Sequence, residues 1–445
     1  MGQNHFTLSD GGVSAAFVRR RIRWAISARC PSKSENAHPG GPRVSFFERC
    51  ASNNSASLVS GTPTVDFARF NGLQTLLDLN NVPVDTYTSV VITLGPATIG
   101  YLQTQAGAAP TIQSENASLT QSTITIPLSS PLVVTSGEPI GLRLDFDLHK
   151  SIQVDANGNI TGTVTPTFNL KAVAPTDPGG FIDEFDAAVL SVDAQGQSFQ
   201  IQGPHGRQFT VNVNGQTEFD GGGSLGDLTT SSIVQISGNI DRADSTIDAN
   251  EVAILSQDGF YAGGQITYVQ PSSGPATNFD LYVRGLLPTT TGLTLGQIAQ
   301  VNLTGNENYF IYWMRNPITQ YLFNSSTLVP GQHVAIGRPA SGAANPQAVT
   351  AKRVVLRHWG YNGTVVSNSV DTAAGSFQMN VTGFAGQLVP GVVTVYTGDL
   401  TQFRNGLTGI GDVGSATSIR VVGLLIKDQS SGQLVLLAHY VDSLD

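Results

Sequence analysis

The sequence is poor in cysteine, in charge and in long apolar runs, and each shortage excludes something. Its 2 cysteines, Cys30 and Cys50, lie near the start, so the rest of the chain can form neither a disulfide nor a thiolate metal site. No run of about eighteen apolar residues occurs, so the sequence predicts no membrane-spanning helix. Charged residues make up only 12% of the 445 positions, which is unlike a helical cytosolic protein.

What is abundant fits an all-β protein. Hydrophobic residues make up 40% of the chain, while 49 glycines, 22 prolines and many Thr, Ser, Asn and Gln supply turns and uncharged polar faces. This profile is typical of extracytoplasmic all-β proteins. A chain of 445 residues is too long for one core and suits three or four domains of roughly 100 to 150 residues each.

The charge is unevenly distributed along the chain. Of a net charge of −9, residues 1–50 contribute 8 Lys and Arg against 3 Asp and Glu, or +5, which leaves −14 for the remainder. An acidic body repels phosphate backbones. We therefore expect no nucleic-acid partner.

Residues 1–58 show neither the period of a strand nor that of a helix. Residues 19–24 are basic, like the start of a signal peptide, but residues 25–30 are too few and too charged to be its apolar segment. We expect residues 1–58 to be disordered or foreign to the natural mature protein. In that case the export signal is not recognisable in this chain.

Alternating apolar residues then predict a β-sandwich over residues 59–174. Predicted strands span residues 86–94, 122–126 and 140–148, and one or two helical turns are expected at 70–77. Strands with one apolar face suit a sheet that covers a core on one side.

Three copies of one pattern follow a linker rich in Pro and Gly. The copies cover residues 180–257, 258–359 and 360–445, and each has a strand with a Phe, a strand that ends in Gly and a strand with Ala-x-x-Val. These residues are Phe199, Gly238, Ala249 and Val252; Phe279, Gly337, Ala351 and Val354; Phe377, Gly423, Ala438 and Val441. About five short strands without a helix predict a small closed barrel in each copy, which also removes exposed strand edges.

Both regions resemble families of bacterial envelope proteins of unknown function. Residues 142–151 (Leu-Arg-Leu-Asp-Phe-Asp-Leu-His-Lys-Ser) and 82–90 (Val-Pro-Val-Asp-Thr-Tyr-Thr-Ser-Val) are similar to motifs of a sandwich domain, domain of unknown function 4382. Its members usually begin with further strands, so the resemblance implies an N-terminally incomplete sandwich or a misassigned start. The repeats, most of all the first, resemble the tandem OB-like barrels of domain of unknown function 5666. Both resemblances imply an exported bacterial protein.

The densest aromatic segment is peculiar to the second copy. In a strand, Phe310 and Tyr312 would lie on one face, and Tyr309, Ile311 and Trp313 on the other. If exposed, Tyr309, Tyr312 and Trp313 would form a stacking platform for sugar rings or bases. The alternative is core packing, since one face of the strand must point inward.

Carboxylates cluster at two places in the first copy. Three Asp and one Glu fall between Asp241 and Glu251, and Ca²⁺ prefers carboxylate oxygens, but the spacing lacks the calcium-loop pattern. Because Asp248 and Glu251 belong to a predicted strand and are expected to face water, a solvated hairpin is the favoured interpretation. Residues 183–186 (Asp-Glu-Phe-Asp) form a similar, weaker cluster.

Two other motifs have ordinary explanations. Asp145 and Asp147 share a predicted strand face and could act as an acid–base pair, but such carboxylates are usually solvated or paired with a neighbour such as Lys150. Residues 409–414 fit Gly-x-Gly-x-x-Gly, yet a strand follows them, so a loop is expected rather than a nucleotide site.

No catalytic, cofactor-binding or metal-binding constellation is recognisable, and the 7 histidines, His358 and His439 among them, are scattered. The sequence predicts an exported or cell-envelope structural or binding protein without catalytic activity, whose partners would be envelope proteins or glycans. Two alternatives remain: a carbohydrate-binding module that uses Tyr309, Tyr312 and Trp313, and a hydrolase whose residues converge only in the fold. Short linkers between the copies favour a rigid rod of barrels.

Overall fold

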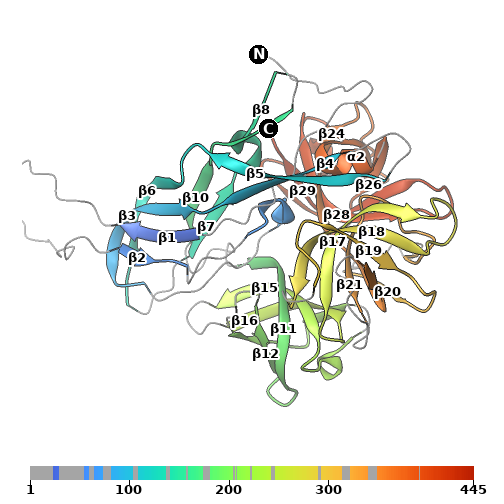
Figure 1. Cartoon of the computed structure of the whole chain (residues 1–445), viewed down its shortest axis with the longest axis horizontal. Coiled ribbons are helices and arrows are strands. Elements are labelled where there is room, and N and C mark those ends of the chain that lie inside the picture. The colour runs from blue at the N-terminus through green and yellow to red at the C-terminus, as the bar shows by residue number, and fades with distance from the viewer. Residues whose placement is uncertain are drawn as a thin grey trace, which may run out of the picture.

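The structure is a computed structural model, and it describes residues 24–29, 55–59, 65–73, 82–103, 109–136, 141–156, 159–173, 181–203, 206, 208–220, 223–241, 246–288, 292–312, 321–338, 348–389 and 391–445. Within these ranges nearly every regular element is a strand, and the strands form a sandwich and three small barrels (Figure 1). The predicted all-β fold is therefore confirmed. No helix in the described part of the chain is long and apolar enough to cross a membrane.

The sandwich packs three groups of strands around an apolar core. One sheet has the order β2-β1-β3-β6, another the order β4-β5-β9-β8, and β7 pairs with β10. Val90 and Ile92 are buried in this core, and Leu142 packs against it, as the alternation predicts. The strands are β1 (Trp24–Arg29), β2 (Ser55–Ser57), β3 (Asp85–Leu94), β4 (Ala97–Gln103), β5 (Thr111–Leu119), β6 (Thr123–Val134), β7 (Gly141–Phe146), β8 (Ile152–Val154), β9 (Ile160–Val164) and β10 (Phe168–Val173).

Strands β1 and β2 lie within residues 1–58, for which the sequence predicts no regular structure. β1 pairs antiparallel with β3 along its whole length, and β2 pairs antiparallel with β1. In the sequence, the 6 residues of β1 directly follow the basic residues 19–23, a context that indicates a targeting segment rather than a strand. The sandwich therefore includes strands upstream of the motifs that predicted it.

The strand expected at residues 140–148 is shorter in the structure. β7 ends at Phe146, because Asp147 leaves the strand to cap α1 (Leu148–Ser151) and accepts a 3.0 Å hydrogen bond from the Lys150 backbone N–H. Lys150 Nζ lies 2.8 Å from the other oxygen of Asp147. Partial burial alone would raise the pKa of the Asp147 carboxyl, but the hydrogen bonds from Lys150 outweigh it and hold the pKa below its ordinary value. Asp147 and Asp145 therefore share no strand face.

Each repeat forms a closed barrel with one strand order. In the first barrel β12-β11-β15-β16 are neighbours, and β13 closes the circle by pairing with β12 and β16. The third and fifth strands pair in parallel in every copy, which gives the OB-like order 1-2-3-5-4. The strands are β11 (Phe181–Asp193), β12 (Ser198–Gln202), β13 (Gln208–Asn212), β15 (Ile233–Asp241) and β16 (Thr246–Ser256); β17 (Tyr261–Gln270), β18 (Asn278–Leu287), β19 (Ile298–Asn302), β21 (His333–Gly337) and the interrupted fifth strand β22 (Ala348–Thr350) with β23 (Arg353–Arg357); β24 (Trp359–Val365), β25 (Ser376–Val381), β26 (Val392–Tyr396), β28 (Ile419–Lys427) and β29 (Leu434–Ser443).

Each copy contains further elements besides the five predicted strands. In each copy a short extra strand pairs in parallel with the fifth strand, namely β14 (Glu218–Asp220), β20 (Asn308–Ile311) and β27 (Gln402–Arg404). The third copy also has helices α2 (Gly383–Leu388) and α3 (Ile410–Val413), so the expectation of strands alone is wrong there. Residues 409–414 thus form a loop with one helical turn before β28.

The glycine that recurs in the fourth strand is required by a close approach in two barrels. A Cβ on Gly238 would lie 2.3 Å from the backbone oxygen of Asp248, and one on Gly423 would lie 2.1 Å from the backbone oxygen of Leu437. Both glycines sit at a bulge in the pairing with the fifth strand. The repeated glycine therefore follows from barrel geometry.

Gly423→Ala is expected to lower the free energy of unfolding by about 1–3 kcal/mol, because the added methyl group overlaps the backbone of β29. Gly411→Ala is the matched control, since a Cβ there meets nothing within 4 Å. Urea unfolding followed by circular dichroism measures both variants. Equal unfolding midpoints for the two would contradict the close approach.

The three barrels pack in a closed ring. Leu255 of the first barrel shares an apolar cluster with Tyr261 of the second, and Leu424 of the third barrel belongs to the core cluster of the second. The first and third barrels meet through a 2.6 Å hydrogen bond from the Tyr440 hydroxyl to Asp183 Oδ1. Because the first and third copies touch, the predicted rod is wrong. Short linkers restrict the distance between neighbours but not the direction of the next copy.

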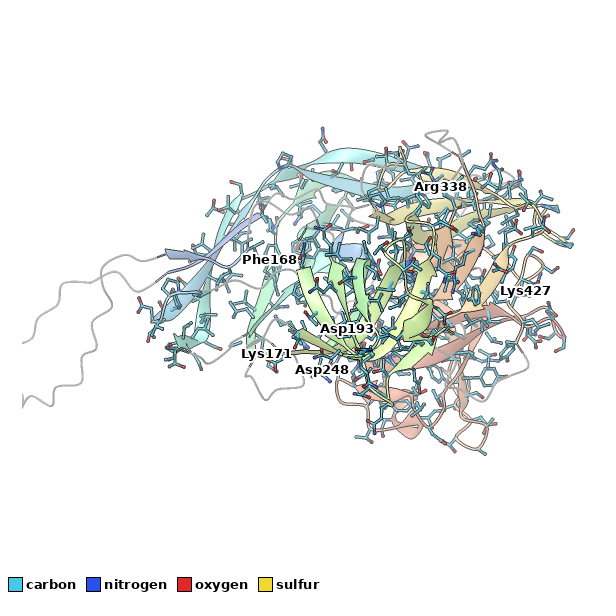
Figure 2. The ribbon with its side chains drawn as sticks, turned by 90° about the horizontal axis from the view of Figure 1, so that it is seen from below. Phe168, Lys171, Asp193, Asp248, Arg338 and Lys427 are labelled. Atoms are coloured by element: carbon cyan, nitrogen blue, oxygen red, sulfur yellow. The ribbon has the colours of Figure 1, made fainter. Side chains whose placement is uncertain are left out.

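The β4–β5 hairpin fastens the sandwich to this ring. It extends from the sandwich to the third barrel (Figure 1), where Leu102 is buried in the core cluster and Ile112 packs against it. Figure 2 shows the assembly from below and labels residues of each unit: Phe168 and Lys171 in the sandwich, Asp193 and Asp248 in the first barrel, Arg338 in the second and Lys427 in the third.

Candidate functional site

Residues 65–73, here called the connecting segment, join the sandwich to the ring. The short 3-10 helix η1 (Phe67–Phe70) places Phe67 against Phe146 of the sandwich, with ring centroids 4.9 Å apart. At the other end Leu73 is buried in a cluster with Val422 and Tyr440 of the third barrel. The segment therefore has an apolar anchor on each side.

Between these anchors the connecting segment makes polar contacts with the barrels. Asp66 Oδ2 lies 3.1 Å from Arg284 Nη1 of the second barrel. Arg69 forms an ion pair with Asp186 of the first. The Asn71 amide donates a 2.9 Å hydrogen bond to the backbone oxygen of residue 360 in the third. One short segment thus contacts all members of the ring.

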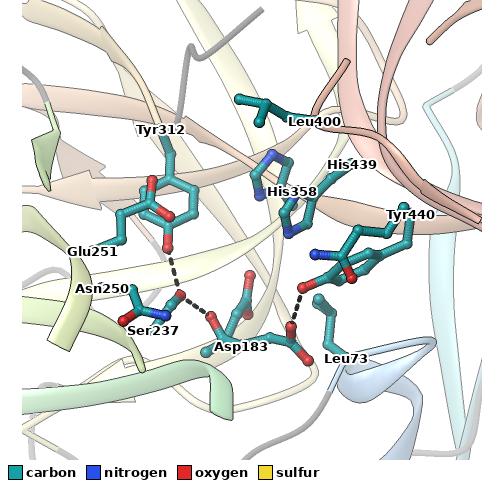
Figure 3. Close-up of a pocket in the computed structure, with 12 residues that line it drawn as sticks. Leu73, Asp183, Ser237, Asn250, Glu251, Tyr312, His358, Leu400, His439 and Tyr440 are labelled. Atoms are coloured by element: carbon teal, nitrogen blue, oxygen red, sulfur yellow. Dashed lines mark hydrogen bonds between the residues drawn. The ribbon is translucent and has the colours of Figure 1, made fainter. Parts of the chain in front are cut away.

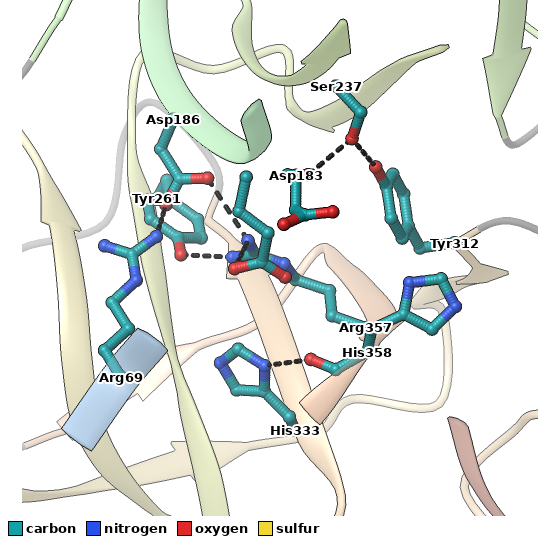
Figure 4. A network of polar contacts seen from close by, with 10 residues as sticks. Arg69, Asp183, Asp186, Ser237, Tyr261, Tyr312, His333, Arg357 and His358 are labelled. Atoms are coloured by element: carbon teal, nitrogen blue, oxygen red, sulfur yellow. Dashed lines mark hydrogen bonds and ion pairs between the residues drawn. The ribbon is translucent and has the colours of Figure 1, made fainter. Parts of the chain in front are cut away.

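Arg357 is the centre of a buried charge network (Figure 4). Its side chain is 0% exposed, and its Nη2 lies 3.1 Å from Glu184 Oε2 and 3.2 Å from Asp186 Oδ1. Its Nη1 donates a hydrogen bond to the hydroxyl of Tyr261, and Arg69 pairs with the second oxygen of Asp186. Two guanidinium groups and two carboxyl groups therefore meet inside the protein, drawn from two barrels and the connecting segment.

The two carboxyl groups of this network differ in acidity. Burial alone would raise the pKa of Asp186, but Arg357 and Arg69 outweigh it and hold the pKa below its ordinary value. Burial raises the pKa of Glu184, and the opposing attraction of Arg357 does not cancel that effect. Asp186 is therefore the firmly ionised member of the pair.

A cavity of about 190 Å³ adjoins the network where the three barrels meet (Figure 3). Leu400 at its rim is 47% exposed, and Asn250 and Gln402 are also exposed, whereas Glu184 and Tyr312 on its floor are each 2% exposed. Its lining consists of Leu73; Asp183, Glu184, Ser237, Asn250 and Glu251; Tyr312 and His358; Leu400, Gln402, His439 and Tyr440. The cavity is thus an open pocket with a buried polar floor.

Hydrogen bonds hold the side chains of this floor in place. The Tyr440 hydroxyl donates to Asp183 Oδ1, and the Ser237 hydroxyl donates to the backbone oxygen of Asp183 (Figure 3). Ser237 Oγ also lies 2.9 Å from the hydroxyl of Tyr312. Glu184 Oε1 is buried and makes no hydrogen bond within the described residues. The floor therefore combines hydroxyl groups held by hydrogen bonds with one acceptor, Glu184 Oε1, that can accept a further hydrogen bond.

Two histidines form a flat part of the cavity wall. The rings of His358 and His439 stack with centroids 5.0 Å apart and planes inclined by 8°. Burial, with the neighbouring His439, holds the pKa of His358 well below its ordinary value. Behind the wall, His333 Nδ1 donates a 2.9 Å hydrogen bond to the backbone oxygen of His358, and burial with Arg357 lowers the pKa of His333 as well. His333 and His358 are therefore neutral near pH 7.

Comparison with known families identifies the two regions of the chain. Residues 42–162 match the family described as Domain of unknown function (DUF4382), and residues 180–253 match the family described as Domain of unknown function (DUF5666). Both predicted resemblances are confirmed. The DUF4382 match begins upstream of the motifs that suggested it and includes β2, and the DUF5666 match falls on the first barrel.

Other comparisons add little. No curated protein matches the sequence. A solved structure named "drosophila Unr CSD456" aligns with 59% of this chain and 98% of its own, at 10% sequence identity and a TM-score of 0.16. At that TM-score the likeness carries no argument about this chain.

The aromatic residues proposed as a ligand surface are separated by the structure. Tyr312 lines the cavity, and Phe310 packs with its cluster, whereas Tyr309 and Ile311 pack against the core of the second barrel. The two predicted faces of the strand are therefore real, and both are covered. Tyr309 is partly buried, with its ring 5.7 Å from that of Phe323. Trp313 lies outside the described residues.

The acidic residues between Asp241 and Glu251 differ in their exposure to solvent. Asp248 is exposed and accepts a 3.0 Å hydrogen bond from Asn212, as a solvated hairpin predicts. Glu251 is 8% exposed and lines the cavity, so the expectation that it faces water is wrong. The extra strand β14, which is not part of the predicted repeat, pairs with β16 at this position, with Glu218 beside Glu251. Among the described residues no group of three His, Cys, Asp or Glu side chains could hold a metal ion.

The buried network around Arg357 was not apparent from the sequence. Glu184 and Asp186 lie in β11 and meet Arg357, which is 171 positions beyond Asp186. One signal was present: Arg357 ends the apolar run Val354, Val355, Leu356 in β23, a place where solvation is difficult. Nothing in the repeat pattern indicates which acidic residues would reach it.

Proposed function

We propose that this protein is a non-catalytic binding protein of the cell envelope, in which the ring of barrels is a fixed frame and the cavity receives a small ligand. The observation that carries the proposal is the form of the cavity, which has an exposed rim and a buried polar floor supplied by all three barrels. Small ligands most often bind in concave sites with a few convergent polar groups.

Contacts between the barrels support the proposal of a fixed frame. The connecting segment contacts every barrel, and the Arg357 network joins the first barrel to the second without exposure to solvent. Separating the first two barrels would leave buried charges without their partners. Because that is strongly unfavourable, the network holds these barrels together. A binding site formed between separate barrels requires such a fixed geometry.

The bonding of the floor favours binding over catalysis. Ser237 is the serine of the cavity, and its hydroxyl contacts the Asp183 backbone oxygen and the Tyr312 hydroxyl. Asp183 in turn accepts the hydrogen bond of Tyr440. A nucleophilic serine is activated by a hydrogen bond to a general base such as histidine. The Ser237 hydroxyl instead donates to a backbone oxygen, so these contacts do not activate it as a nucleophile.

The envelope location is supported by the composition and by the resemblance to envelope families. A chain with 12% charged residues, 49 glycines and an all-β fold suits an extracytoplasmic protein. Partners in that location would be envelope proteins or glycans.

Ligand binding can be tested by thermal unfolding of the full chain against a library of small polar compounds. Leu400→Trp places an indole at the rim of the cavity, and Leu322→Trp is the control, since Leu322 is 55% exposed and is not part of the lining. A ligand at about 100 times its Kd should stabilise the wild type and the control by about 2.7 kcal/mol. If no compound stabilises the wild type more than Leu400→Trp, the binding role is contradicted.

The envelope location needs a separate measurement. Fractionation of the native host, with an antibody against the ring, should recover the protein outside the cytoplasm. Recovery in the cytosol alone would remove the envelope from the proposal and leave the binding role to the ligand experiment.

A further inference from the structure

The cavity at the centre of the ring has dimensions suited to one small ring. Its volume is about 190 Å³. Sites for drug-sized ligands are larger, at roughly 300–1,000 Å³. A single sugar ring is of the size that fits.

The charge of the lining restricts the ligand further. Asp183, Glu184 and Glu251 contribute carboxyl groups, and the described residues of the lining include no lysine or arginine. A cavity lined by carboxyl groups repels phosphate and carboxylate ligands. An anionic ligand is therefore disfavoured.

The polar groups of the lining match a ligand that both donates and accepts hydrogen bonds. The buried Glu184 Oε1 has no hydrogen-bond partner within the described residues and can accept from a ligand hydroxyl. Asn250 and Gln402 at the rim offer amides that donate and accept. Glu184 is already paired with Arg357, whose Nη2 lies 3.1 Å from its Oε2, so its carboxyl group does not require a cationic ligand.

One wall of the cavity is aromatic. The stacked rings of His358 and His439 continue into the ring of Tyr440, whose centroid lies 3.9 Å from that of His439. Such a wall can pack against the C–H face of a sugar ring while its hydroxyl groups reach the polar floor.

We infer that the cavity between the three barrels binds one neutral sugar residue, as a free sugar or as the end of a glycan. The inference rests on the proposed binding role and names its ligand. Glu184, Asn250 and Gln402 accept or donate hydrogen bonds to the sugar hydroxyls, and the stacked histidines contact its apolar face.

The test uses the full chain and isothermal titration with glucose, galactose, mannose and N-acetylglucosamine, beside glucuronate and putrescine as charged probes. At least one neutral sugar should bind the wild type and Leu322→Trp, and bind Leu400→Trp at least ~10-fold more weakly. Gln402→Ala should weaken binding about 2- to 12-fold, the loss of one hydrogen bond, and it keeps the test valid if Leu400→Trp folds poorly.

The outcomes separate the ligand from the binding role. Binding of putrescine or glucuronate alone, abolished by Leu400→Trp, would overturn the sugar inference while supporting the binding role. Sugar binding that is equally strong in Leu400→Trp and Gln402→Ala would overturn the cavity as its site. If no sugar binds, the inference falls, and the compound library then decides whether the binding role falls with it.

Discussion

Arg357→Met is expected to lower the free energy of unfolding by about 3–5 kcal/mol, because it leaves two buried carboxyl groups with one guanidinium between them. Arg357 is 0% exposed and lies within 3.2 Å of both Glu184 and Asp186. Methionine preserves much of the apolar stem but supplies neither charge nor hydrogen bonds. Because the network joins the first two barrels, the loss should also loosen their contact. Urea unfolding at neutral pH measures the effect.

Two further variants make this prediction specific. Arg338→Met is the matched control, because Arg338 is only partly buried and lies over the ring of Phe260, 4.6 Å from its centroid, outside the network. Arg338→Met should lower the free energy of unfolding by less than about 1 kcal/mol. Adding Glu184→Gln to Arg357→Met removes one uncompensated carboxyl group and should restore part of the stability, while Asp186 keeps Arg69. Equal losses for Arg357→Met and Arg338→Met would contradict a structural role for the network.

The fold was largely predictable because it depends on repeated local requirements. Gly238 and Gly423 recur since a side chain at either place would overlap the neighbouring backbone. Phe199, Phe279 and Phe377 recur since each is buried in the core of its own barrel. Residues that have the same structural role in each copy recur in the sequence, so the repeat can be recognised from them. The short strands of one repeat then predict a barrel.

The candidate site was not predictable because it depends on differences between the copies. Glu184 of the first barrel and Tyr261 of the second lie near the starts of their first strands, and both side chains contact Arg357. Such contacts need the barrels placed in a ring, and the sequence pattern describes each barrel alone. Strand β1 was not predicted for another reason, since it directly follows a basic segment that resembles the start of a signal peptide.

The Asp183 contact joins the first and the last copy of the repeat. Tyr440 of the last copy reaches Asp183 of the first, so the chain closes on itself. The connecting segment then occupies the junction, with Arg69 in the network and Leu73 beside the cavity. The sandwich is therefore joined to the same place that contains the candidate site, and the stability of that place should depend on the state of its ionisable groups.

Acidification should destabilise the protein well before its carboxylates titrate. His333 and His358 are buried, and burial holds the pKa of each well below its ordinary value, so the folded state keeps both neutral. Below about pH 6.5 the unfolded chain takes up two protons that the folded chain does not, so stability falls as the pH falls. Each histidine contributes about 1.4 kcal/mol per pH unit below that point, or about 2.7 kcal/mol for the pair.

Variants separate the histidines from other groups that titrate. Glu184 acts in the opposite sense, because a carboxyl group with a raised folded pKa stabilises the folded state as the pH falls. We therefore compare slopes rather than absolute values. His333→Gln, which retains a donor for the backbone oxygen of His358, should reduce the number of protons taken up on unfolding near pH 6 by about one. Urea midpoints between about pH 7.5 and pH 5.5 give the slopes, and a His333→Gln slope equal to that of the wild type would mean that His333 is protonated inside the folded ring.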